Sequence, residues 1–331
     1  MNSTIVLLKT TSPACPSRTN GRHPAVAPAA NHADGVPVAG ARSPIARLAV
    51  ALLVSALTLA PAMTASAALI DNFVAGWTFD ETSGNFADAS GNGNDATAVG
   101  TPYGTGSNGI VGGALDLGGS PDSANAGTGV GDFAATDAFS VSFWLNLDDN
   151  TNFYSFLGSR VKSGGTADDE GWSVRTGAGG DRDEIRFQFF SNDGLTEEGR
   201  AIQTGVQLST DVWQHIVVAH DGSSDLSGVS IYVDGTLVSS GLTDNTALLS
   251  DTVAENEPFV VGGRETSSNG YVDGEMDEVG LWSRVLTTDE VGELYNEGNG
   301  LSMGTIIPEP STAAMFLIAI SALLASRRHR R

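Results

Sequence analysis

The chain has 331 residues, of which 39 are acidic and 17 are basic, giving a formal net charge of −22. All acidic residues except Asp34 lie between residues 71 and 309, where 8 basic residues accompany them, so this span alone carries a net charge of −30. Such a charge excludes nucleic acid and other phosphate polymers as partners and suits divalent cations or neutral polymers, or simply keeps an exported protein soluble. The single cysteine, Cys15, precedes the span, which excludes disulfide and thiolate chemistry within it.

Residues 1–67 are typical of a leader followed by a secretory signal peptide. An apolar stretch at 45–60 has basic residues at its start, and Ala65-Ser66-Ala67 is a small-residue cleavage pattern. The preceding residues 1–44 are rich in Pro, Ala, Ser and Gly, so either the start codon is assigned too early or the signal has an extended basic region. We expect the mature chain to begin near Ala68.

The span 68–300 carries short runs in which apolar and polar residues alternate, separated by segments rich in Gly, Asn, Asp and Ser. This alternation is the period of a half-buried strand. Asp234-Gly235 between two such runs predicts a hairpin, because both turn residues must take positive φ. We predict strands at residues 75–79, 139–147, 184–189, 213–220, 229–233, 236–238, 259–261 and 276–282.

The pattern predicts one short helix, from Thr287 to Asn296. Thr287 or Thr288 can cap it, and the acidic residues that follow are favourable in a first turn. Its apolar stripe, formed by Val291, Leu294 and Tyr295, is narrow, so we expect the helix to lie on the surface of the sheets. Strands with almost no helix imply an all-β fold, an antiparallel two-sheet sandwich.

Five blocks of sequence, taken in order over residues 73–297, resemble the concanavalin A-like jelly roll in its bacterial laminin-G-like version. No single block is specific, whereas the ordered set is. The blocks are Trp77–Gly84 with Asp88–Ala96, Gly113–Leu117, Phe139–Trp144, Trp213–Val217 with Ile231–Gly235, and Gly274–Val279 with Leu286–Tyr295. The resemblance implies a jelly-roll sandwich of about a dozen strands, and binding of carbohydrate or protein more often than catalysis.

The resemblance also implies a structural calcium ion, held between an N-terminal loop and an Asp of the last long strand. Asp277 matches the strand position, and Asp80, Asp88 and Asn92 can join it from the N-terminal side. Calcium takes roughly six to eight oxygen ligands, which carboxylates and the carbonyls of an Asn- and Gly-rich turn can supply. The alternative is that residues 88–93 only form a turn from residues that tolerate positive φ.

The sequence supports a catalytic role less well than a binding role. Glu275-x-Asp277 matches the first two carboxylates of the Glu-x-Asp-x-Glu strand of laminarinase-type glucanases, which share the fold. Alternation along a strand brings all three of those carboxylates to one face. Here the third position is Val279, and Glu278 is expected on the opposite face. We therefore expect no catalytic residues and no enzyme, and keep a glycoside hydrolase as the less favoured alternative.

Three aromatic residues near expected loops are candidate ligand-binding residues: Trp172, Tyr154 and Tyr271. An exposed ring can stack on the apolar face of a sugar, although core packing is the commoner fate of Trp. The expected partner is a polysaccharide or another extracellular polymer. The competing class is a structural or adhesive matrix protein without a small ligand.

The C-terminal segment resembles the PEP-CTERM sorting signal of Gram-negative bacteria, because Pro308-Glu309-Pro310, an apolar run at 311–326 and a basic end follow one another. The run is just long enough to cross a bilayer, and basic residues stay on the cytoplasmic side. We predict a linker at 301–310 and a transmembrane helix with a basic tail at 311–331. The resemblance implies transient anchoring in the inner membrane, cleavage by an exosortase-type enzyme, and delivery to the cell surface or extracellular matrix.

Overall fold

The computed structural model describes residues 69–118, 121–162, 169–177, 182–190, 200–202, 207–224, 226–240, 257–263 and 270–307. The predicted leader and signal peptide, the Pro308-Glu309-Pro310 motif and the predicted membrane helix all lie outside these residues. Within the ranges just given, no helix is long and apolar enough to cross a membrane.

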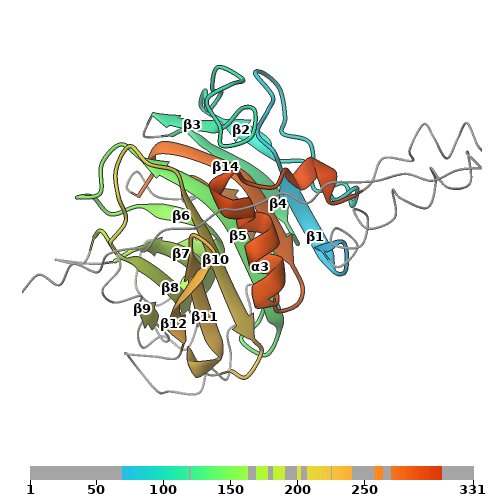
Figure 1. Cartoon of the computed structure of the whole chain (residues 1–331), viewed down its shortest axis with the longest axis vertical. Helices are drawn as coiled ribbons and strands as arrows, with labels where there is room; N and C mark the ends of the chain where they lie inside the picture. Colours follow the sequence, from blue (N-terminus) through green and yellow to red (C-terminus); the bar gives the residue numbers. More distant parts are fainter. Residues whose placement is uncertain are drawn as a thin grey trace, which may run out of the picture. The chain divides into compact units, whose positions relative to one another are not determined.

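The described strands form two seven-stranded antiparallel sheets that pack face to face as a sandwich (Figure 1). Sheet 1 has the order β1 (Phe73–Trp77), β14 (Asp273–Trp282), β5 (Ala138–Leu147), β10 (Gln214–Asp221), β11 (Val229–Val233) and β12 (Thr236–Ser240), with β3 (Leu115–Gly118) also on β14. Sheet 2 has the order β2 (Thr97–Val99), β4 (Ser123–Thr128), β13 (Pro258–Val261), β6 (Ser155–Lys162), β7 (Asp169–Thr176), β8 (Ile185–Phe190) and β9 (Arg200–Ile202). The predicted all-β two-sheet architecture is confirmed.

Alternation along the central strands builds the core between the sheets. On β5, the predicted apolar set, Phe139, Val141, Phe143, Leu145 and Leu147, faces the inter-sheet core. The predicted hairpin forms at Asp234-Gly235, where φ is 49° and 72° and β11 pairs with β12. The strands therefore follow from local pattern where the pattern is regular.

α3 (Thr288–Tyr295) and the segment after it cover the outer face of sheet 1, where they form a second apolar cluster with residues of the sheet (Figure 1). The Tyr295 ring stacks on Trp144 with 5.8 Å between centroids. Met303, in the short 3₁₀ helix η4 (Met303–Thr305), and Ile306 are buried in the same cluster. Residues 301–307 thus belong to the folded domain and not to the linker predicted at 301–310.

His215 lies under this cover, on β10, with its Nε2 atom 2.8 Å from the Ser142 hydroxyl. Burial lowers its pKa from 6.5 to about 3, so the unfolded chain binds this proton and the folded one does not. The stability that His215 contributes is present above about pH 6.5 and is lost as the pH falls towards 3, about 2 kcal/mol of it by pH 5. Urea unfolding of the wild type and of His215→Gln at about pH 5 and about pH 7 checks this, because the difference between the two proteins isolates His215 from the carboxylates that titrate in the same range.

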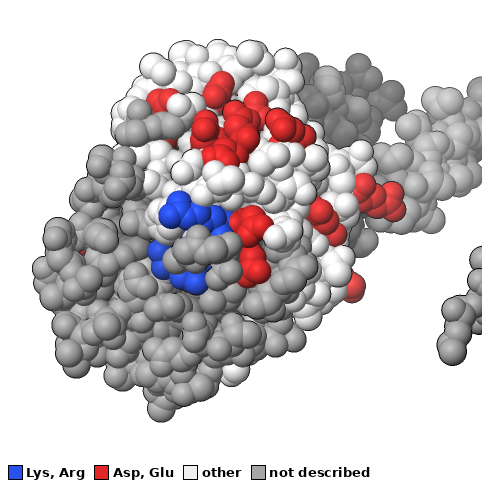
Figure 2. Space-filling model, turned by 90° about the vertical axis from the view of Figure 1, so that its left-hand side faces the viewer, with Lys and Arg blue, Asp and Glu red and all other residues white. Residues whose placement is uncertain are grey.

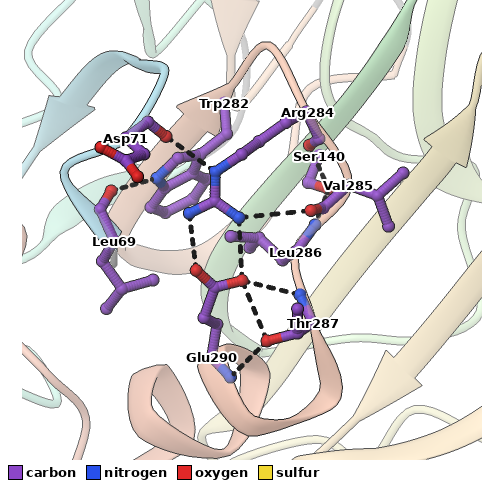
Figure 3. Close-up of polar contacts among 9 residues, drawn as sticks. All are labelled: Leu69, Asp71, Ser140, Trp282, Arg284, Val285, Leu286, Thr287 and Glu290. Carbon is purple, nitrogen blue, oxygen red and sulfur yellow. Dashed lines mark hydrogen bonds and ion pairs between the residues drawn. The ribbon is translucent and has the colours of Figure 1, made fainter. Parts of the chain in front are cut away.

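A polar network joins the start of the described chain to α3 (Figure 3). The indole of Trp282 donates to the Leu69 carbonyl at 2.7 Å, and Arg284 Nε donates to the Asp71 carbonyl at 2.8 Å. The Arg284 guanidinium also pairs with Glu290 at 2.7 Å. Although burial alone would raise the pKa of Glu290, bonds from Arg284 and from the helix cap hold it below its usual value.

The helix begins as predicted, since Thr287 is its N-cap and forms a capping box with Glu290. One carboxylate therefore serves both the cap and the ion pair with Arg284. We expect Arg284→Ala to lower the free energy of unfolding by about 2 kcal/mol, because it leaves a partly buried Glu290 and a backbone carbonyl unpaired. Val285→Ala, at an exposed side chain next to Arg284, is the control and should change it by less than about 0.5 kcal/mol. Equal effects of both in urea unfolding would contradict this role of the network.

Candidate functional site

A glycine-rich loop at 109–113 wraps two carboxylates that are far apart in sequence. Val111 N donates to Asp277 Oδ2 at 3.1 Å, and Gly113 N donates to Asp80 Oδ1 at 2.6 Å. The approach requires glycine, because a Cβ on Gly112 would come within 2.2 Å of Asp80 Oδ1. The structure therefore brings Asp80, at the end of β1, to Asp277, in the middle of β14.

Electrostatics makes this pair receptive to a cation. Burial is the largest cause that raises the pKa of Asp277 to about 7, and the charge of Asp80 raises it further. Asp277 is fully buried, so a charged form in the folded protein needs a compensating partner. The donors are hard oxygens, which fits calcium. The two carboxylates give only part of a calcium shell, and the described residues contain no group of three or more His, Cys, Asp or Glu able to hold a metal. Loop carbonyls and water would have to complete it.

The other two predicted ligands lie in a separate turn. The carboxylate of Asp88 accepts four hydrogen bonds, from Gly76 N, Ser90 N, Ser90 Oγ and Asn94 N, at 2.7 to 3.1 Å. The Asn92 side-chain amide donates to the carbonyls of β1, and Gly91 and Gly93 take φ of 75° and 85°. Asp88 and Asn92 thus fasten a turn to β1, as the alternative interpretation held, and do not join Asp80 and Asp277.

A β-bulge in β14 changes the expected direction of Glu278. The register with β5 shifts between Asp277 and Gly280, and Glu278 has a φ of 47°. Its carboxylate is buried and accepts from Met303 N at 2.5 Å, on the outer side of sheet 1. The expectation from simple alternation, that Glu278 faces away from Asp277, is therefore corrected by the bulge. Burial first, and then Asp277, raise the pKa of Glu278 to about 9.

The carboxylate of Glu275, on the strand that resembles the glucanase motif, already has hydrogen-bond partners within the protein. The two oxygens of Glu275 accept from the Asn108 and Asn146 amides, at 3.1 and 3.0 Å. Val279 lies in the inter-sheet core. No cleft with an acid and a nucleophile across one bond is formed by Glu275, Asp277 and Val279.

The structure places Trp172 in the core, with no solvent exposure. Its ring lies 4.8 Å from that of Phe139 and 6.0 Å from that of Phe259, and its Nε1 donates to the Gly131 carbonyl at 2.8 Å. Neither ring face is left for a sugar. The expectation of a surface platform at Trp172 is thereby corrected to a core position on β7.

The two candidate tyrosines, Tyr154 and Tyr271, differ in how far they are exposed to solvent. Tyr154 is 4% exposed and its hydroxyl donates to Asp149 Oδ2 at 3.3 Å, while burial raises its pKa to about 12. Tyr271 is half-buried and lies beside Gly263, where a Cβ would come within 2.5 Å of the ring. Of the three predicted aromatic residues, Tyr271 alone keeps a substantial part of its surface in solvent.

Sequence reasoning missed the polar outer face of sheet 2. Pairing sets Ser173 opposite Gln188, and Arg175 opposite Arg186, in alternation with the core residues of β7 and β8. Arg175 also donates to Gln188 Oε1, and its guanidinium lies 5.1 Å from the Phe153 ring centroid. The alternation of residues 184–189 carried the signal, because Ile185, Phe187 and Phe189 face the core and the polar residues between them share the opposite face.

A comparison with family models matches residues 118–292 to the Laminin_G_3 model, described as the concanavalin A-like lectin/glucanases superfamily. The chain belongs to this superfamily. The laminin-G-like resemblance drawn from the ordered blocks is thereby confirmed. A comparison with curated proteins finds no match.

Solved structures share the fold of this lectin/glucanase-superfamily chain at low identity. The botulinum neurotoxin serotype D binding domain aligns with a TM-score of 0.50 and 14% identity, over 71% of this chain and 53% of that one. Domain 4 of a GH43 extracellular arabinanase from Geobacillus stearothermophilus, in complex with arabinotriose, aligns with a TM-score of 0.44 and 17% identity. The alignment covers 67% of this chain and 97% of that domain. A Trypanosoma rangeli sialidase in complex with sialic acid aligns with a TM-score of 0.48 and 15% identity, over 71% of this chain but only 34% of the sialidase. At such identities the likeness concerns the fold alone.

Proposed function

We propose that the chain is an exported binding module of the cell surface or extracellular matrix, which binds a polysaccharide or another extracellular polymer and contains a structural calcium ion. The observation that carries the proposal is the match of residues 118–292 to the concanavalin A-like lectin/glucanases superfamily. In this chain the Glu275 carboxylate of the glucanase-like strand is held by two Asn amides, which favours binding over hydrolysis.

The calcium part of the proposal rests on Asp80, Asp277 and the 109–113 loop. Bound there, the ion would neutralise a buried carboxylate and fasten β1, β14 and the loop to one another. Its role would be structural. Gly109 belongs to the same arrangement, since a Cβ on it would come within 2.5 Å of Asp277 Oδ2.

A non-enzymatic role is favoured because the carboxylates of the glucanase-like strand already have partners within the fold. Glu275 accepts from an Asn amide, and Asp277 is buried and accepts from a backbone N–H group. A hydrolase needs one carboxylic acid and one carboxylate on either side of a substrate bond. Incubation with a panel of β-glucans and galactans should release no reducing ends. Release from any of them would replace binding by hydrolysis as the function.

Export is proposed from the two ends of the sequence. The signal at 45–67 and the Pro308-Glu309-Pro310 segment would direct the chain through the inner membrane to an exosortase-type enzyme. In a Gram-negative host with such an enzyme, mass spectrometry of the surface form should find both ends removed. A Glu309→Ala chain should stay in the membrane fraction. Cytoplasmic recovery of the intact chain would contradict export.

A glycan array probed with the whole chain, in calcium and in EDTA, tests the binding role. We expect retention on one class of polysaccharide. Retention in the extracellular matrix with no glycan bound would instead support the competing structural or adhesive role.

A further inference from the structure

The last residues that the structure describes form a closing segment (residues 301–307), which lies on the outer face of sheet 1 and has hydrogen bonds of its own. Ser302 caps η4, because its hydroxyl accepts from Gly304 N at 3.3 Å. Ile306 N donates to the Met303 carbonyl at 3.3 Å. The closing segment is therefore compact and not an extended linker.

A pair of glycines in sheet 1 forms a socket for the side chain of Met303. Gly76 of β1 and Gly280 of β14 lie opposite each other in the strand register. A Cβ on Gly280 would come within 2.8 Å of Met303 Sδ and within 2.5 Å of the Trp282 ring. A Cβ on Gly76 would come within 3.3 Å of Met303 Cβ. The two strands leave room for Met303 because neither carries a side chain at this point.

A buried carboxylate holds the backbone of the same residue. Glu278, which the bulge in β14 places on the outer side of sheet 1, accepts a hydrogen bond from Met303 N. Glu278 is 0% exposed and Met303 is 1% exposed, so loss of this bond would leave buried polar groups without partners. Opening of the closing segment therefore breaks the backbone contact and the socket contact of Met303 together.

The closing segment also completes the apolar cluster on this face. Met303 and Ile306 are buried there with Trp282 and with Leu69, at the start of the described chain, and Ile307 packs against the same cluster. Without the closing segment, apolar side chains of the sheet would lose their cover, which is unfavourable in proportion to the area exposed. The closing segment is therefore a part of the folded domain.

This packing limits where a protease can act. Proteases cleave exposed chain readily, whereas packed chain becomes available only after local unfolding. The closing segment is packed, since Met303 and Ile306 are buried and η4 is folded. The predicted membrane helix begins at residue 311, so only residues 308–310 separate it from the closing segment.

The charge of the domain also keeps a membrane-embedded enzyme away from the domain's body. Residues 71–309 carry a net charge of −30, and Figure 2 shows acidic side chains gathered on the face that it views, beside a basic group. An anionic bilayer surface repels such a body within a Debye length, roughly 8 Å at physiological ionic strength. Such an enzyme therefore reaches first the residues that follow the closing segment.

We infer that the closing segment stays in the processed protein, and that the sorting cleavage breaks one of the peptide bonds between Ile307 and Ser311. In that hydrolysis the carbonyl carbon takes the hydroxyl group of a water molecule and the nitrogen takes its proton. The inference rests on the proposed export and names the position of its C-terminal cut. The socket and Glu278 set the inner limit of that cut, because they hold the chain closed up to the sorting motif.

Mass spectrometry of the surface form locates the cut, with the whole chain expressed in a Gram-negative host that has an exosortase-type enzyme. We expect the last residue of the processed chain to lie within 307–310. A last residue before Ile307 or beyond Pro310 would overturn the inference and leave the proposed export standing. Recovery of the intact chain in the cytoplasm alone would overturn both.

Limited digestion of the whole chain with proteinase K tests the role of the socket directly. Met303→Ala empties the socket, and Glu278→Ala removes the acceptor for the backbone. Each should speed cleavage within the closing segment about tenfold or more, since each favours local opening. Glu278→Gln keeps an acceptor oxygen on a side chain of the same shape, so most of the protection should return.

Glu297→Gln is the matched control, at an exposed carboxylate in the short 3₁₀ helix η3 (Asn296–Gly298) that precedes the closing segment. It should change the rate less than about twofold. Circular dichroism shows whether the sheets persist in each variant. Equal rates for the wild type and Met303→Ala would overturn the role of the socket. Loss of the sheets in Met303→Ala would support it, because the closing segment would then be needed for the fold itself.

Discussion

Replacing Trp172 by Ala is expected to lower the free energy of unfolding by about 3–5 kcal/mol, the cost of removing a large aromatic side chain from a packed core. The ring is fully buried between residues of both sheets, and its indole N–H satisfies the Gly131 carbonyl. The substitution therefore creates a cavity and also leaves a buried acceptor without a donor. Urea unfolding monitored by circular dichroism measures the change.

Tyr271→Ala is the matched control for Trp172→Ala. Tyr271 is half-buried, so its loss should cost no more than about 1–2 kcal/mol. Trp172→Phe should fall between the two, because it keeps ring packing against Phe139 but loses the bond to Gly131. If Trp172 were a sugar platform, its removal would abolish saccharide binding with little loss of stability, and that pattern would contradict the core position.

The regular part of the fold was readable from the sequence, and the reason is local. On β5, an apolar residue occupies every second position from Phe139 to Leu147 and, Trp144 excepted, the residues between them are polar, so one face had to be core. The Asp234-Gly235 turn fixed the β11–β12 hairpin through its backbone angles alone. At Thr287, the cap and the acidic first turn fixed the start of α3.

The strand β7 could not be predicted, because its identity comes from its neighbours. It begins with Asp169-Glu170-Gly171, a typical turn composition, and yet it lies between β6 and β8 with seven register pairs to β6. Pairing on both edges overrides the weak local preference. The residues before Trp172 therefore indicate a loop, whereas Trp172 is a core residue on β7.

The candidate cation site was predicted in part. A resemblance supplied Asp277 and a set of N-terminal partners, and the structure keeps only Asp80 beside it. Composition cannot show which of several Asp residues uses its oxygens within its own turn, as Asp88 does. The bulge at Glu278 was equally hidden, since an extra residue in a strand leaves no periodic signal.

The stability that Asp277 contributes to the cation-free protein is expected to fall as the pH rises from about 4 to about 7, opposite in sign to the contribution of His215. Burial and Asp80 raise the folded-state pKa of Asp277 from 3.8 to about 7, so between these values the folded chain holds a proton that the unfolded chain has released. The contribution of Asp277 is then full below about pH 4 and is lost as the pH rises through 7, by up to about 4 kcal/mol. The neighbouring Glu278, with its pKa raised from 4.5 to about 9, adds to this fall from about pH 4.5 and extends it above pH 7.

Calcium should reverse this loss, because it binds the charged carboxylate and only in the folded state. At a calcium concentration of about 100 times the dissociation constant, the expected stabilisation is about 2.7 kcal/mol. Differential scanning calorimetry in calcium and in EDTA, at about pH 5 and about pH 8, measures both effects. Calcium should raise the Tm more at the higher pH.

Asp277→Asn isolates the residue, since the amide keeps the shape of the side chain and cannot ionise. Its Tm should respond neither to calcium nor, from this position, to pH between 4 and 7. Asp88→Asn is the matched control: it disturbs a carboxylate with four hydrogen bonds, so stability falls, but the calcium response remains. A calcium response lost in Asp88→Asn and kept in Asp277→Asn would move the cation to the turn at 88–94, and a wild-type Tm indifferent to EDTA would remove it altogether.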